Sequence, residues 1–430
     1  MVKKFSEEEV HQYIWASGIA GLIAETDVFD DWTTSCVEHD EDGESNFELW
    51  RLIKHKALEK LGNLHGNMTD SQLIGSKVKL PTDGTRPMEL DFLGQHDDGI
   101  FILELKVDRS AERNAFSELL GYSYYISEMF ALSGPKDITN VLVTPLFAKM
   151  SRHAFLYDLL ISDRNIILYQ PTFTTDEIGS LRLELYIPSD EDFQHFSNEL
   201  LSHEAMTCVV ASFHDIEGWI DSEEENGSLN DYTVEHLEAV SSYCAQLMEA
   251  ERLHGFCWTR KRWKEIPVFY ENALIICALN PFRIINPLRS EPLLEQLDPE
   301  DVVSLRELAE SGFHGRLLSV AKRALEDTLT NNPSIELEMP EWSVMVTTGM
   351  ETVFTHNLGF RPTGMLRDAY VANINSLFAY EASGGKYCDN SPLKVNETFN
   401  WFKAWTFMEG CGFSAKNEIE DYEGDEDIED

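Results

Sequence analysis

Two charged residues interrupt the apolar run IFILELKV at residues 100–107. Side chains alternate between the two faces of a β-strand, so Ile100, Ile102, Glu104 and Lys106 share one face. Burying a carboxylate or an ammonium group is costly unless the charge is paired or binds a ligand. We therefore expect a strand whose end carries a polar site. An exposed salt bridge on an edge strand is the alternative, but it does not explain why both charges fall inside an apolar run.

The preceding segment is predicted to pair with this strand. MELDFLG, residues 88–94, alternates like a strand, and QHDDG is a turn that contains the Asp-Gly signature. In such a hairpin Asp91 lies across from Glu104. Two carboxylates with room for water suit Mg²⁺, with Mn²⁺ as an alternative. The ion lowers the pKa of a bound water and stabilises charge on a phosphoryl group, while Lys106 orients that water or offsets negative charge.

The order of elements around the hairpin predicts an α/β fold. The apolar spacing and the turn signals indicate helices at 46–61, 110–132 and 152–161, and strands at 76–80, 88–94, 100–107, 140–145 and 165–171. Ser110 is the expected N-cap of the second helix, with Glu112 in its first turn. This order predicts an αβββαβ core around a central mixed sheet.

The segment ELDFLGQHDDGIFILELK, residues 89–106, resembles the PD-(D/E)xK nuclease signature. It is most similar to the RecB-like and NucS-like branch, and the resemblance covers about residues 46–170. It implies a restriction-endonuclease-like core in which Asp91, Glu104 and Lys106 are catalytic and the two acids bind the metal.

The same resemblance implies three further site residues. The branch carries a Gln-x-x-x-Tyr motif on the next helix, where this chain has Glu118 and Tyr122, with glutamate replacing glutamine. The family's upstream acid, a third metal ligand, falls at Glu48, and Glu44 is its rival.

The expected function is therefore a Mg²⁺-dependent endonuclease or exonuclease that hydrolyses phosphodiester bonds, with DNA favoured over RNA. The resemblance implies a setting in restriction, repair or antiviral defence. A non-catalytic scaffold or binding subunit of a larger nucleic-acid complex, which keeps the nuclease fold, is the alternative. A small-molecule enzyme has no supporting motif, and GxxxxGK[ST] is absent, which argues against ATP hydrolysis by a P-loop.

Composition shifts divide the chain into five parts. We expect an acidic helical extension at 1–45, the nuclease-like domain at 46–214, an acidic linker at 215–231, a mixed α/β recognition or partner-binding domain at 232–413, and a disordered acidic tail at 414–430. Helices are expected at 233–253, 299–311, 315–328 and 396–409, with a buried strand at 273–279. A protein partner or a second copy of the chain is an open alternative for the fourth part.

One segment of this fourth part is basic. Residues 252–264, RLHGFCWTRKRWK, hold five Lys or Arg and no acid, with aromatic residues between them. Such a mixture suits phosphate contacts and base stacking. The predicted nucleic-acid-binding residues are Arg252, Trp258, Arg260, Lys261, Arg262 and Lys264. A strand that packs its aromatic residues inward beneath a basic rim is the equal alternative.

Charge and cysteine content limit the partners and the cellular compartment that the chain suits. The net charge of −42 disfavours nucleic acid, but residues 1–45 hold 12 acids against 2 bases whereas residues 46–170 hold 16 against 14. A solvated acidic surface is the simplest interpretation. Seven scattered cysteines without a CxxC pair predict a reduced, cytoplasmic protein. No apolar stretch is long enough to span a membrane and no signal peptide is evident.

Overall fold

The structure is a computed structural model that describes residues 5–29, 37–39, 45–81, 88–112, 114–130, 134, 136–197, 200–215, 229–263, 269–283, 292–329, 334–349 and 355–382. The chain forms two compact units, the first from residues 1–34 and 53–193 and the second from residues 35–52 and 194–430. Within the described ranges no helix is long and apolar enough to cross a membrane.

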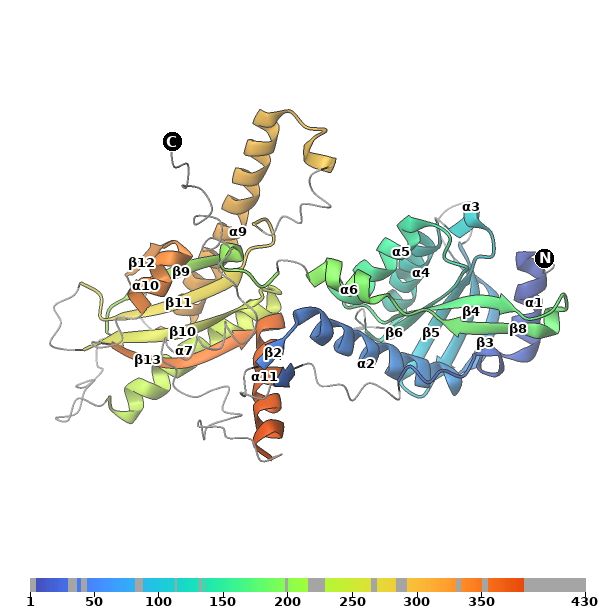
Figure 1. Cartoon of the computed structure of the whole chain (residues 1–430), viewed down its shortest axis with the longest axis horizontal. Helices are drawn as coiled ribbons and strands as arrows, with labels where there is room; N and C mark the ends of the chain where they lie inside the picture. The colour runs from blue at the N-terminus through green and yellow to red at the C-terminus, as the bar shows by residue number, and fades with distance from the viewer. Residues whose placement is uncertain are drawn as a thin grey trace, which may run out of the picture. The chain divides into compact units, whose positions relative to one another are not determined.

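A six-stranded sheet forms the centre of the first unit (Figure 1). Its strands are β3 (Gln72–Leu80), β4 (Met88–His96), β5 (Gly99–Leu105), β6 (Ile138–Val143), β7 (Ile166–Phe173) and β8 (Leu181–Leu185), which lie in that order across the sheet. The pairs β3–β4, β4–β5 and β7–β8 are antiparallel, and β5–β6 and β6–β7 are parallel. The predicted mixed sheet is confirmed.

Helices cover both faces of this sheet. The chain enters through α1 (Glu7–Ser17), the 3₁₀ turn η1 (Ala20–Leu22) and α2 (Leu49–Thr69), and continues through α3 (Arg109–Glu112), α4 (Ala115–Met129), α5 (Lys149–Leu156), the π-helical turn η2 (Tyr157–Ile161), the 3₁₀ turn η3 (Ile178–Ser180) and α6 (Asp190–Ser197). Together, α2, β3, β4, β5, α4 and β6 give the predicted αβββαβ order, and this part of the prediction is confirmed.

Side-chain contacts show which helix lies on which face. Ser123 of α4 donates a hydrogen bond to Asn140 of β6, whereas His65 of α2 lies 3.2 Å from the hydroxyl of Tyr169 in β7. Because Asn140 pairs with Ile166 in the β6–β7 register, Tyr169 faces away from α4. Thus α4 and α2 lie on opposite faces. The crossovers β5–α4–β6 and β6–α5–β7 both connect neighbouring parallel strands and advance across the sheet in the same direction. Because such crossovers are right-handed, α5 lies on the same face as α4 and beside it.

One predicted helix is split in two. The segment expected as a single helix at 110–132 forms the short α3 and the separate α4. Glu112, the last residue of α3, is fully buried, and its carboxylate accepts the N–H groups of Phe147 and Ala148 at 2.9 and 3.0 Å. These bonds fix the end of α3 to the loop before α5, so Glu112 is not in the first turn of α4.

The second unit has a five-stranded sheet in the order β12–β9–β11–β10–β13. Its elements are the 3₁₀ turn η4 (His203–Ala205), β9 (Met206–Phe213), α7 (Asp231–Ala250), β10 (Gly255–Arg262), β11 (Asn272–Leu279), α9 (Pro299–Thr328), β12 (Ile335–Glu338), α10 (Trp342–Gly349), β13 (Thr355–Thr363) and α11 (Gly364–Ala382), with the short strands β1 (Val37–His39) and β2 (Ser45–Phe47). The order β9–α7–β10–β11–α9–β12 and the antiparallel pairing form a split βαβ motif, extended by β13.

The observed units correct the predicted boundaries. The segment 194–214 was predicted to end the first domain, but β9 pairs with β11 along its whole length and so belongs to the second sheet. The N-terminal segment is not a separate extension, because His11 of α1 stacks on Phe92 of β4 with ring centroids 4.2 Å apart. Residues 396–409, the tail 414–430 and most of the predicted linker lie outside the described residues.

Helix α9 is continuous where two helices were predicted. It runs without interruption through residues 312–314, between the two predicted helices, and contains Gly312 and Gly315. Phe313, Leu317 and Val320 are buried on the helical face of the second sheet, and this burial outweighs a cost of about 1 kcal/mol for each glycine. The N-terminal half of α9 extends beyond this packed part (Figure 1).

Candidate active site

The β4–β5 hairpin positions the predicted catalytic residues. His96 pairs with Gly99 across the turn, and Phe92 pairs with Leu103. Gly94 lies under the ring of Phe101, where a Cβ atom would be 2.1 Å from the ring, so only glycine fits. The Asp91 carboxylate accepts the Leu105 N–H at 2.9 Å, which fixes Asp91 beside the end of β5.

Glu104 is the most strongly perturbed acid of this site. It is 2% exposed, and one carboxylate oxygen, Oε1, accepts a short hydrogen bond from the Lys106 ammonium group. The other oxygen, Oε2, is buried without a hydrogen-bond partner. Burial, and then the charge of Asp91, raise the pKa of Glu104 to about 9. The fold therefore holds a carboxyl group where its ionised form is poorly stabilised.

Lys106 joins two acids. Its ammonium group contacts Glu104 and also lies 2.9 Å from Oε2 of Glu118, on the first turn of α4. Burial lowers the pKa of Lys106, but the Glu104 and Glu118 carboxylates outweigh this effect and raise it above its ordinary value. Lys106 is therefore a fixed positive charge. Glutamate at position 118, where the resembling branch has glutamine, makes an ion pair with it.

Tyr122 has a different environment from the one expected. The side chain is buried and its hydroxyl donates a 2.8 Å hydrogen bond to the carbonyl of Glu89 in β4. Burial, together with the charges of Glu104 and Glu118, raises the pKa of Tyr122 to about 12. Tyr122 thus connects α4 to β4 beside the acids, and its hydroxyl proton is used in the hydrogen bond to the Glu89 carbonyl oxygen.

The sequence prediction missed Glu7, the first residue of α1. Burial raises the pKa of Glu7, Lys106 opposes this effect, and the charge of Asp91 adds to it. Glu7 also interacts with the backbone N–H of Val107, directly after the end of β5. On the same helix, His11 lies 3.3 Å from the Asp91 carbonyl oxygen. The sequence signal was the capping box of Ser6 and Glu9, which starts a helix at Glu7.

The carboxylate of Glu48, the predicted third metal ligand, pairs with Arg51 at 2.6 Å. By its contacts Glu48 belongs to the second unit, and Asp91 and Glu104 belong to the first, so its part in the metal site stays a prediction. Its rival Glu44 is outside the described residues. Across the part of the chain that the structure describes, no three His, Cys, Asp or Glu side chains are grouped closely enough to hold a metal ion.

The two carboxylates that remain still suit a hard cation. Mg²⁺ commonly keeps several waters and takes only one or two carboxylates from the protein. The charge of Asp91 acts on Glu104, and the buried, unpartnered oxygen of Glu104 is an acceptor of the kind that such an ion would satisfy. Asp91 and Glu104 are the residues that would hold Mg²⁺ or Mn²⁺.

The basic segment is mostly interior. Within β10, Trp258 is 3% exposed and donates a hydrogen bond to Asn357 at 3.1 Å, and Lys261 is 2% exposed and pairs with Asp215 at 2.7 Å. The burial of these two side chains contradicts the nucleic-acid contacts predicted for them. They are buried because β10 lies between β11 and β13 in the middle of the sheet. Arg260 and Arg262 are half-buried, Arg252 is exposed, and Lys264 lies outside the described residues.

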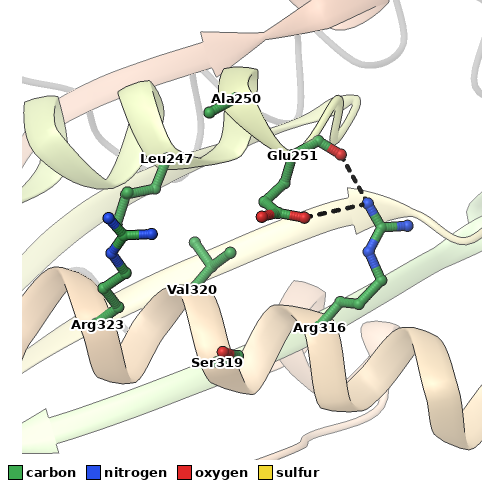
Figure 2. A pocket seen from close by; sticks show the side chains of 7 residues that line it. All are labelled: Leu247, Ala250, Glu251, Arg316, Ser319, Val320 and Arg323. Atoms are coloured by element: carbon green, nitrogen blue, oxygen red, sulfur yellow. Dashed lines mark hydrogen bonds and ion pairs between the residues drawn. The ribbon is translucent and has the colours of Figure 1, made fainter.

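A cavity in the second unit is unrelated to these acids. It lies between α7 and α9 and is lined by Leu247, Ala250, Glu251, Arg316, Ser319, Val320 and Arg323 (Figure 2). Arg316 is already occupied, since its guanidinium lies 2.6 Å from the carbonyl oxygen of Glu251 and 3.7 Å from its carboxylate. Arg323 pairs with Asp327 at 3.5 Å, so both arginines of this cavity already have an acidic partner.

Comparisons with known proteins provide little support for any assignment. No protein-family model and no curated protein matches the chain. Among solved structures, an XisH family protein from Nostoc punctiforme matches with 13% sequence identity over 33% of this chain and 98% of that chain, with a TM-score of 0.18. A likeness at that TM-score carries no argument about this protein.

Proposed function

We propose that the protein is a metal-dependent nuclease that hydrolyses phosphodiester bonds at the end of β5, with DNA favoured over RNA as its substrate. The observation that carries the proposal is Glu104, which lies near Asp91, binds the fixed ammonium group of Lys106 through one oxygen and has its other oxygen buried without a hydrogen-bond partner. A buried acceptor of this kind costs stability unless a ligand satisfies it.

Each residue has a distinct part in this proposal. Asp91 and Glu104 bind Mg²⁺ or Mn²⁺, which supplies Lewis-acid stabilisation of a phosphoryl group and lowers the pKa of water. Lys106 offsets charge on the scissile phosphate or orients the attacking water, and Glu118 fixes the position of Lys106. Tyr122 holds α4 against β4, so that Glu118 stays beside the strand end.

A direct assay tests the proposal. The protein is incubated with single- and double-stranded DNA and RNA in the presence of Mg²⁺, Mn²⁺ or EDTA. We expect cleavage that needs either ion and stops with EDTA. A protein that is inert toward every nucleic acid and ion combination would refute catalysis and favour a binding subunit that retains the fold.

Metal binding has its own expected signature. A ligand that binds only the folded state at one hundred times its Kd stabilises that state by about 2.7 kcal/mol. Mn²⁺ should therefore raise the Tm of the wild type by several degrees. Asp91→Ala should abolish this increase, whereas Glu48→Gln should retain it, because the Glu48 carboxylate is already paired with Arg51. Thermal unfolding with and without Mn²⁺ measures both. If Glu48→Gln also abolishes the Mn²⁺-induced increase in Tm, Glu48 is a ligand of the metal.

Glu7 provides a second test of the site's extent. Its charge acts on Asp91 and Lys106 from α1, outside the segment that resembles a nuclease. Glu7→Gln should lower the apparent affinity for Mn²⁺ by about tenfold, the scale expected for a residue that tunes a ligand from outside its coordination shell. Isothermal titration of the metal measures this change, with Glu8→Gln on the exposed side of the same turn as the control. Equal affinities in the two variants would exclude Glu7.

A further inference from the structure

The first unit exposes a row of large apolar side chains on two neighbouring helices. Leu120 and Tyr124 of α4, Met150 of α5, and Tyr157 and Ile161 of η2 are 48–70% exposed. We call these five residues the α4–α5 face. Apolar residues on a protein surface are ordinary when they are scattered, but a contiguous patch indicates an interaction site.

Contacts beneath the helices show that these side chains are contiguous. On α4, Tyr122 reaches β4, whereas Ser123 reaches β6, so the side of the helix that carries Leu120 faces α5. Helix α5 runs in the same direction as α4, because both connect parallel strands of one sheet. Ser151 and Phe155 are the buried residues of α5 and so mark the side of the helix that faces the sheet. Helical spacing then places Met150 and Tyr157 on the side toward α4. It places Arg152 on the side away from α4. The two apolar rows therefore meet between the helices.

The charges around this face suit a second copy of the chain. The full chain carries a net charge of −42, but residues 115–164 hold five acids and four bases, a difference of −1. Two copies can approach here without the repulsion that the rest of the acidic surface imposes. An anionic membrane or nucleic acid lacks any such advantage, because the face is close to neutral.

The remaining charges are also self-complementary. Glu128 lies near the end of α4, on its outer side, and Lys149 and Arg152 lie at the start of α5, on the opposite outer side. The acidic and the basic positions lie at opposite corners of the face. A two-fold axis that lies in the plane of the face, perpendicular to the diagonal joining these corners, exchanges them. It therefore brings Glu128 of each copy to Lys149 and Arg152 of the other, as an isologous interface requires.

We infer that the α4–α5 face pairs two copies of this chain, with the apolar rows at its centre and the Glu128–Arg152 contacts at its rim. The inference is independent of nuclease activity. Pairing covers Leu120 and Tyr124 on the helix that also carries Glu118 and Tyr122, so it would stabilise the position of α4.

Sedimentation velocity across a dilution series from about 100 µM to about 0.1 µM tests the inference over the range of ordinary dimer affinities. The wild type should sediment as a dimer of the 49.1 kDa chain at the upper end. Tyr124→Glu combined with Met150→Glu should be monomeric throughout. Leu308→Glu, which places a charge on an equally exposed apolar residue of α9 in the second unit, should dimerise like the wild type. A wild type that is monomeric at every concentration overturns the inference.

A charge exchange tests the same face without apolar changes. Glu128→Arg and Arg152→Glu should each weaken dimerisation by about fivefold to tenfold, and combining them should restore it, because both are rim contacts. Each variant is first checked for folding by circular dichroism. Wild-type dimerisation in all three variants, or no restoration in the double variant, would place the interface on another surface.

Discussion

Replacing Glu104 with glutamine is expected to reduce metal-dependent cleavage on the order of 10³-fold, the scale seen when one electrostatic group of an active site is removed. Glutamine preserves the shape of the side chain and its place in β5, but it removes the negative charge and replaces one carboxylate oxygen with an NH2 group, which cannot bind a cation. The rate constant for cleavage of a labelled duplex, measured at saturating Mg²⁺, tests this expectation.

Two further variants separate chemistry from folding. Lys106→Ala should lose a similar factor in rate while it retains the Mn²⁺-induced increase in Tm, because the lysine does not bind the ion. Glu235→Gln, a change of the same kind at an exposed position of α7, should cleave like the wild type. Wild-type cleavage by Glu104→Gln would remove the proposed site even if the protein proves to be a nuclease.

Truncating Leu317 to alanine is expected to destabilise the second unit by roughly 2–5 kcal/mol, since the residue is fully buried between α9 and the sheet. Leu308→Ala on the same helix should change stability by less than about 0.5 kcal/mol, because Leu308 is 73% exposed. Amide hydrogen exchange along β11 measures both effects locally. Similar exchange rates in the two variants would contradict the packing of α9 described above.

The parts of the fold that could be predicted depend on local patterns. The β4–β5 hairpin was recognisable because its alternation and its turn lie within twenty residues, and the αβββαβ order followed from helical and strand spacing. The position of β9 was not recognisable. Its apolar run fits either sheet, and only pairing with β11, about seventy residues later, places it in the second.

The site was predictable to the same extent. Asp91, Glu104 and Lys106 come together through neighbouring strands, whereas Glu7 reaches them from a helix more than eighty residues earlier, with no signal in the hairpin itself. The basic segment misled for a physical reason. Lys261 shares the face of β10 that packs against α7, so its charge is buried and paired with Asp215, and charge alone cannot distinguish a buried ion pair from a phosphate contact.

The division of the chain into units has a consequence for its synthesis. Residues 35–52 belong to the second unit although residues of the first unit precede and follow them. A ribosome that adds about 5–20 residues per second needs roughly 10–40 seconds to pass from the end of the first unit to the end of α11. The first unit can fold during this interval, but the early segment must wait for its neighbours. Ribosome pausing within α7 or α9 should therefore leave β1 and β2 without the rest of the second unit, and open to proteases and chaperones.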